Sequence, residues 1–159
     1  GTGKSTLIAT MCKNIRNNRP VVKAAPTNIA ARNISGHTLA SLYSNAKWKR
    51  SPPTWETDAV LIIDEVSMVS AEDLDLYSES ASALLVNDKP FGGMQVVFVG
   101  DLFQLSPFNE DKKGDKPKYF FSSEVYPKLK ARMFNLTKIY RQIEDTSFAD
   151  ILNRFRWGI

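Results

Sequence analysis

The sequence predicts an α/β domain, a three-layer sandwich with a mainly parallel central sheet. Two continuous apolar runs, residues 59–63 and 95–99, are typical of parallel strands that are covered on both faces. Segments with helical periodicity precede and separate these runs, which is the alternation expected of βαβ units. The chain also opens on a glycine-rich stretch that leads straight into a helix, a pattern typical of phosphate-binding domains.

The opening stretch predicts the second half of a phosphate-binding loop. Its glycines let backbone N–H groups curl around a phosphate, Lys4 places a positive charge near the outer phosphates, and the Ser5 hydroxyl can complete a magnesium shell. The consensus glycine that opens such a loop would precede the chain, and so would the strand that delivers it. We therefore expect a fragment whose N-terminal strand is truncated. The candidate nucleotide-binding residues are Gly1, Thr2, Gly3, Lys4, Ser5 and Thr6.

A dinucleotide-binding fingerprint fits the same stretch less well, because Thr6 stands where its third glycine is needed. The segments that follow predict a helix over residues 6–16 with Cys12 on its buried face, a strand over 21–25, a helix over 28–34 and a short helix over 37–42. Thr27 and Thr38 stand at the helix starts. Hydroxyls at such junctions either cap the helix or donate to a nucleic-acid phosphate, and residue types alone favour capping.

Two adjacent carboxylates, Asp64 and Glu65, end the first apolar run. The carboxyl edge of a parallel sheet is where open α/β domains bind ligands, and a phosphate loop upstream supplies the matching half of a nucleotide site. Asp64 can hold magnesium through a water, and Glu65 can orient and polarise an attacking water. The pair therefore predicts ATP hydrolysis, against the alternative of a solvated acidic strand end.

The second half of the chain predicts a helix from residue 71 to about 86, capped by Ser70, and then the strand over 95–99. Gln104, just past that strand, can hydrogen-bond a γ-phosphate and report its loss. Residues 109–118 predict a solvated charged loop, residues 133–136 a further strand and residues 146–156 a last helix. Arg141 lies between the last two and could reach the γ-phosphate from the far side.

Composition limits the class of protein but does not indicate a function. The 159 residues suit one domain, and a net charge of +4 is compatible with a polyanionic partner. One cysteine excludes an internal disulfide and, with a single histidine, a zinc site, so a reducing compartment is expected. Composition does not identify that compartment; the expectation is an intracellular protein, in the nucleus or the mitochondrion if the source is a eukaryote. No apolar run approaches a membrane span, so no membrane partner is expected.

With these motifs in place, the chain closely resembles the Pif-one-type, RecD-like DNA helicases of helicase superfamily one, over essentially its whole length. The resemblance rests on the phosphate loop, on Ala25-Pro26-Thr27, on Ile63-Asp64-Glu65-Val66-Ser67-Met68, on Phe91-Gly92-Gly93-Met94-Gln95 leading into Gly100-Asp101-Leu102-Phe103-Gln104-Leu105, and on Leu136 with Arg141-Gln142. It implies that residues 1–159 are a single, partial RecA-like P-loop NTPase domain. The second motor domain of such an enzyme is absent from the sequence.

The resemblance implies an ATP-dependent 5′-to-3′ DNA helicase that uses ATP and Mg²⁺, with Gln104 sensing the γ-phosphate and Arg141 acting as arginine sensor. Thr27, Thr38 and Ser41 would contact single-stranded DNA, and the second RecA-like domain of the same chain would close on the nucleotide. Asn28 and Ala40 depart from the glycine and histidine usual in the family. A role in DNA repair, recombination or telomere maintenance would follow from the family as well.

Two alternatives remain beside the helicase. A GTPase needs a glycine where Ser67 stands and a base-reading Asn/Thr-Lys-x-Asp motif, and neither is present. A helicase remnant of a mobile element or virus would bind nucleotide or DNA without turnover. The intact Lys4, Glu65, Gln104 and Arg141 argue against such decay.

Overall fold

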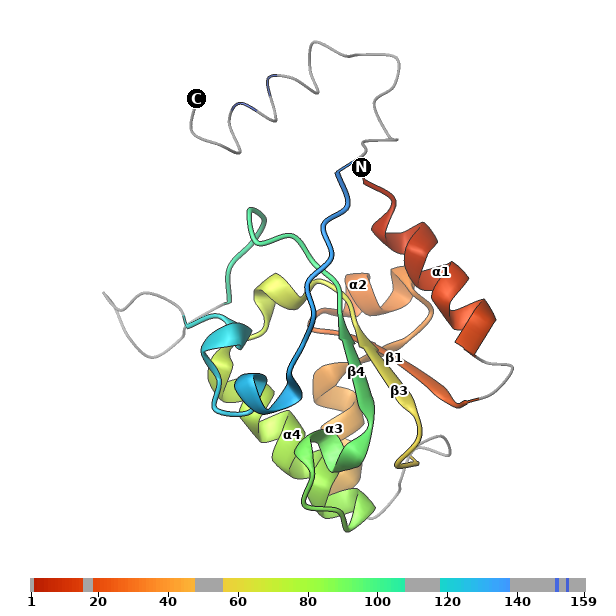
Figure 1. Ribbon diagram of the computed structural model, residues 1–159, viewed down its shortest axis with the longest axis vertical. Coiled ribbons are helices and arrows are strands. Elements are labelled where there is room, and N and C mark those ends of the chain that lie inside the picture. Colours follow the sequence, from red (N-terminus) through yellow and green to blue (C-terminus); the bar gives the residue numbers. More distant parts are fainter. Residues whose placement is uncertain are drawn as a thin grey trace.

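Four parallel strands form the central sheet of the computed structural model, in the order β2-β1-β3-β4 (Figure 1). They are β1 (Val21–Ala25), β2 (His37–Thr38), β3 (Val60–Ile63) and β4 (Gln95–Phe98). The structure describes residues 2–15, 19–47, 56–107 and 118–137, together with residues 151 and 154. The predicted α/β class with a parallel sheet is confirmed.

The sheet separates two apolar cores, so the domain has three layers. Val60 and Ile62 of β3 face one core, whereas Leu61 and Ile63 face the other, because successive side chains of a strand point to opposite faces. All four are essentially inaccessible to solvent. This explains why the sequence of β3 is a continuous apolar run and not an alternating one.

Helices cover both faces of the sheet. The helices α1 (Lys4–Ile15) and α2 (Asn28–Asn33) contribute Ile8, Cys12, Ala30 and Ala31 to one core. The helices α3 (Leu39–Lys47) and α4 (Ala71–Leu85) cover the other face with residues that include Leu42 and Leu74. Short 3₁₀ turns complete the described fold: η1 (Val66–Met68), η2 (Pro90–Gly93), η3 (Phe120–Ser122) and η4 (Tyr126–Leu129).

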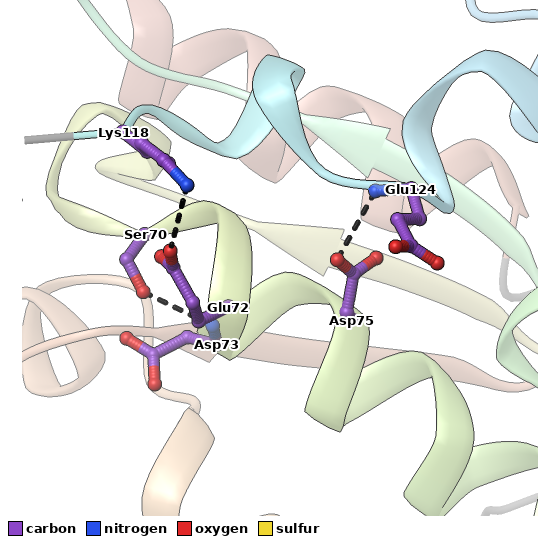
Figure 2. A network of polar contacts seen from close by, with 6 residues as sticks. All are labelled: Ser70, Glu72, Asp73, Asp75, Lys118 and Glu124. Atoms are coloured by element: carbon purple, nitrogen blue, oxygen red, sulfur yellow. Dashed lines mark hydrogen bonds and ion pairs between the residues drawn. The ribbon is translucent and has the colours of Figure 1, made fainter.

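The start of α4 anchors the segment that returns after residue 117 (Figure 2). Ser70 caps the helix, with its Oγ accepting from the Asp73 amide at 3.0 Å, as predicted. Asp75 accepts from the amides of Glu124 and Val125 at 3.1 and 2.9 Å, which fixes the chain ahead of η4. The ion pair of Lys118 with Glu72, at 3.8 Å, is exposed and adds little.

Two predicted elements differ from the structure. His37 and Thr38 form the short strand β2 and not the first turn of a helix, because they pair with Ala24 and Ala25 of β1. The strand predicted over residues 133–136 does not form: residues 131–137 are exposed and belong to no ladder. A strand needs a neighbour to satisfy its N–H and C=O groups, and no described strand pairs with this segment.

Candidate nucleotide and nucleic-acid site

The predicted site residues follow the strands at one edge of the sheet. The parallel register pairs Ala25 with Thr38, and the Asp64 amide donates to the Ala24 carbonyl at 2.9 Å. The Val99 amide in turn donates to the Ile63 carbonyl at 2.8 Å. The loops after all four strands therefore meet at the carboxyl edge, which is where ligands bind in open parallel sheets.

The phosphate loop lies at that end of the molecule (Figure 1). Gly3 has a φ of +86°, a conformation that favours glycine, and its carbonyl accepts from the Leu7 amide at 2.9 Å. The helix α1 starts at Lys4, which is half-buried, while Ser5 and Thr6 are exposed in the first turn. Free N–H groups and the positive end of the helix dipole at such a terminus attract a phosphate. Gly1 lies outside the described residues.

The two carboxylates differ in exposure. Asp64 is 6% exposed, and its Oδ1 accepts from the Glu65 amide at 2.9 Å. Glu65 is half-buried and adopts a left-handed backbone, with φ 50° and ψ 42°. That conformation costs free energy for a residue with a side chain, and it is common at functional sites. Asp64 is therefore buried at the carboxyl edge of the sheet, and the backbone leaves the extended conformation of the strand at Glu65.

Gly100 joins the carboxylate turn to the loop after β4. The Val66 amide donates to the Val99 carbonyl at 3.0 Å. A Cβ on Gly100 would lie 2.9 Å from Val66 Cγ1 and 3.0 Å from Val66 N. Any larger residue would push the two loops apart. The structure therefore gives this glycine a packing role between the turn after β3 and the loop after β4.

Gln104 is exposed and is held by Asp101, a residue whose role the sequence reasoning missed. Gln104 Nε2 donates to Asp101 Oδ2 at 3.2 Å, and the Gln104 amide donates to the Asp101 carbonyl at 2.9 Å. Asp101 Oδ1 also accepts from the Phe103 amide at 3.2 Å. An aspartate that bonds the backbone two residues on marks an Asx turn, and this preference is readable from sequence.

Two of the three predicted DNA-contacting residues, Thr27 and Thr38, cap helices, and Ser41 lies in the first turn of α3. Thr27 Oγ1 accepts from the Ala30 amide at 3.2 Å, and Thr38 Oγ1 accepts from the Ser41 amide at 3.1 Å. These bonds leave the hydroxyl hydrogens of both threonines available as donors. Ser41 Oγ donates to the Thr38 carbonyl at 2.9 Å, so its hydrogen is engaged. Each threonine can thus cap its helix and contact a phosphate at the same time. The Ser41 hydroxyl would have to rotate away from the Thr38 carbonyl before it could donate to a phosphate.

Arg141 lies outside the described residues, as does most of the segment 146–156 that the sequence predicts to be helical; Ile151 and Arg154, which are described, are helical. Within the described ranges, no three His, Cys, Asp or Glu side chains cluster closely enough to hold a metal ion. None of the helices in those ranges has the length and apolar character needed to cross a membrane.

A groove of about 620 Å³ lies between α4 and the segment around η4, and it contains none of the predicted site residues. Its lining includes four carboxylates, those of Asp75, Glu79, Asp88 and Glu124. Asp75 already accepts two backbone N–H groups there. The chemistry that the sequence predicts is concentrated at the carboxyl edge and not in this groove.

Comparison with known proteins identifies relatives of the whole chain. A family described as PIF1-like helicase matches residues 1–158. The chain is 36% identical to the ATP-dependent DNA helicase PIF1 of Saccharomyces cerevisiae over 176 aligned residues, which include 99% of this chain and 20% of the yeast protein. The chain therefore spans about a fifth of this relative.

Two solved structures have the same fold. The crystal structure of Pif1 helicase from Candida albicans matches with a TM-score of 0.84 and 34% identity, over 98% of this chain and 38% of that one. The crystal structure of Pif1 helicase from Bacteroides in complex with ADP-AlF3 and ssDNA matches with a TM-score of 0.81 and 30% identity, over 98% of this chain and 40% of that one.

Proposed function

Because this chain belongs to the PIF1-like helicase family, we propose that it is the first motor domain of an ATP-dependent 5′-to-3′ DNA helicase. The observation that carries the proposal is the arrangement of the carboxyl edge. The loops after β3 and β4 carry Asp64, Glu65 and Gln104, Thr27 follows β1, and Thr38 is the last residue of β2. Nucleotide chemistry and DNA contacts would thus share one edge of one sheet.

The phosphate loop and Asp64 fit a magnesium–ATP complex. Gly3 has a positive φ, which suits a glycine of a phosphate loop, Lys4 would pair with the outer phosphates, and the exposed Ser5 hydroxyl would reach the metal ion. Magnesium keeps several waters and takes few protein ligands, which suits a site formed by Ser5 and the buried Asp64. When bound, magnesium would neutralise charge on the phosphate oxygens.

Turnover would depend on Glu65, Gln104 and Arg141. Glu65 orients the attacking water and accepts its proton, and Gln104 donates a hydrogen bond to the γ-phosphate. Asp101 holds the Gln104 amide in place through the bond at 3.2 Å. Arg141 would add positive charge from the far rim once the second motor domain closes the cleft. The Bacteroides relative crystallised with ADP-AlF3 and ssDNA supports this use of nucleotide and DNA together.

Single-stranded DNA would lie across the β1 and β2 end of the edge, where Thr27 and Thr38 offer hydroxyl donors. Small donors of this kind hold phosphates and read no bases. We propose the 5′-to-3′ polarity, and a role in DNA repair, recombination or telomere maintenance, by analogy with the family. The partners of this domain would be single-stranded DNA and the second RecA-like domain of the same protein.

The test is ATP hydrolysis by a full-length protein that carries this chain, with and without single-stranded DNA. We expect DNA to stimulate turnover, ATP to be preferred over GTP, and duplexes with a 5′ overhang to be unwound in preference to those with a 3′ overhang. Binding of ATP and DNA without hydrolysis would instead identify a helicase remnant. Hydrolysis of GTP that DNA does not affect would favour a GTPase.

A further inference from the structure

Ser67 is a buried residue of the carboxylate turn, and the proposed function leaves its hydroxyl without a role. The side chain is fully buried, and Oγ has no hydrogen-bond partner in the described part of the chain. The other two buried serines of that part are engaged. Ser78 Oγ accepts from the Phe91 amide at 2.9 Å, and Ser123 Oγ accepts from the Tyr126 amide at 3.2 Å. Ser67 therefore carries a polar group that this conformation does not use.

An unused hydroxyl at this depth opposes folding, because the group leaves water without gaining a bond. Alanine would occupy nearly the same space without that cost. A serine at such a position is accounted for if a second conformation of the same site gives its hydroxyl a partner.

The surroundings of Ser67 indicate which part of the site would move. Ser67 is the central residue of η1, which begins directly after Glu65. A Cβ on Gly100 would lie 3.3 Å from Ser67 N, so the main chain of the loop after β4 lies against this turn. The same loop continues to Gln104. Ser67 thus follows Glu65 by two residues, and its main chain lies against the loop that carries Gln104.

We propose that Ser67 is a positioning residue for ATP turnover. Its hydroxyl donates to a main-chain carbonyl of the loop that begins at Gly100 when nucleotide binding shifts that loop, and the new bond fixes Glu65 relative to Gln104. This inference rests on the proposed function of the site. The hydroxyl adds nothing to the nucleotide-free state and stabilises the closed one, so its removal changes the balance between the two states.

The test compares Ser67→Ala with Ser78→Ala in the full-length protein. The thermal midpoint is measured without nucleotide and with ADP, aluminium fluoride and magnesium, and kcat and KM for ATP are measured at saturating single-stranded DNA. For Ser67→Ala we expect an unchanged or higher midpoint without nucleotide and a smaller rise with the analogue. We also expect kcat to fall about fivefold or more at unchanged KM.

Ser78→Ala is the matched control, because it removes a buried serine hydroxyl that has a partner. Its midpoint should fall, since the Phe91 amide loses its acceptor, while kcat stays near the wild-type value. A nucleotide-free midpoint that falls in Ser67→Ala as well, or a wild-type kcat with a wild-type rise on the analogue, would overturn the inference. A wild-type protein that hydrolyses no ATP would refute the proposed function instead, and the midpoints would still decide whether Ser67 responds to the analogue.

Discussion

Gln104 is tied to Asp101 twice, through Nε2 to Oδ2 at 3.2 Å and through its amide to the Asp101 carbonyl at 2.9 Å. Both residues lie in the loop after β4, three positions apart in a turn that Asp101 also stabilises by accepting from the Phe103 amide. The orientation of the proposed γ-phosphate contact therefore depends on a neighbouring carboxylate. Phosphate chemistry in this site would rely on the turn as well as on the glutamine.

Replacing Asp101 tests this dependence. Asp101→Ala removes both side-chain bonds of the turn, and we expect kcat for ATP to fall about tenfold while KM changes little, because a mispositioned Gln104 affects the transition state more than binding. Asp101→Asn keeps one oxygen acceptor for the Phe103 amide and should retain more activity. Steady-state kinetics at saturating single-stranded DNA measure both variants. Equal activity of the alanine variant and the wild type would contradict the positioning role.

The proposed DNA contacts predict a binding mode that depends on salt and not on sequence. Thr27 and Thr38 offer hydroxyl donors suited to phosphates, and neither can read a base edge in a unique way. Affinity for single-stranded DNA should be similar for unrelated sequences, and the net charge of +4 predicts that it falls as salt rises. Fluorescence anisotropy of labelled oligonucleotides over a salt series measures this. Affinity that stays flat with salt, or that varies strongly with sequence, would count against the assignment.

Threonine-to-serine changes make the sharper version of this experiment. Thr27→Ser and Thr38→Ser keep the caps on the Ala30 and Ser41 amides and keep the donors, so DNA binding should persist. The alanine variants remove both functions. Loss of the Thr27 cap alone costs about 1 kcal/mol, so the thermal midpoint of each variant must be compared with its affinity.

A stacked pair of tyrosines predicts alkaline destabilisation. The rings of Tyr43 and Tyr77 lie 4.5 Å apart, and burial, followed by the nearby Asp73, raises the pKa of Tyr77 to about 12. Burial, followed by Tyr77, raises the pKa of Tyr43 further above its ordinary value. Below pH 10 both tyrosine hydroxyls keep their protons in the folded and in the unfolded chain. Above pH 10 the unfolded chain loses these protons first, so stability falls as pH rises.

The measurement is the thermal midpoint between pH 8 and 11.5 for the wild type and Tyr43→Phe. Above pH 10 the buried Tyr43 lowers the free energy of unfolding by about 1.4 kcal/mol per pH unit. Phenylalanine keeps the ring without the ionisable group. We expect a shallower alkaline decline in the variant, whatever its midpoint at pH 8. Parallel declines would show that Tyr43 ionises equally easily in both states.

The 159-residue chain on its own should not unwind duplex DNA. Translocation requires two domains that grip the strand alternately as ATP closes the cleft between them, and this sequence has one set of site residues. In addition, one edge of the described sheet is only partly covered. Among the described strands, β4 pairs with β3 alone, although it has the sequence of a buried strand, and its Val96, Val97 and Phe98 are half-buried. Strand separation assayed with the isolated chain at saturating ATP and magnesium measures this. Steady unwinding would contradict the two-domain argument.

The parts of the fold that could be read from sequence are those fixed by local pattern. The apolar runs of β3 and β4 and the Ser70 cap of α4 are local, and they lie within a residue of the predicted positions. The strand β2 could not be predicted, because two residues have no periodicity and their pairing with Ala24 and Ala25 is a long-range contact. The absent strand at residues 133–136 reflects the same limit, since an apolar segment does not reveal its pairing partner.

In the candidate site too, residue types and motifs can be read from the sequence, whereas contacts between distant loops cannot. Residue chemistry and motif order select the phosphate loop, Asp64, Glu65 and Gln104 as candidates, and these stay predictions. The left-handed backbone of Glu65, the contact of Gly100 with Val66 and the unused Ser67 hydroxyl arise from packing between loops that are far apart in sequence. Such features become visible only when the loops are placed against each other.

In the proposed reaction Glu65 acts on the attacking water while Lys4 binds phosphate. The most direct test of these two roles is multiple-turnover ATP hydrolysis by the Glu65→Gln variant of the full-length protein, with binding of a fluorescent ATP analogue measured alongside. We predict that the variant binds nucleotide like the wild type and loses about a hundredfold or more in turnover, whereas Lys4→Ala loses binding. Turnover by Glu65→Gln within about twofold of the wild type would contradict the assignment.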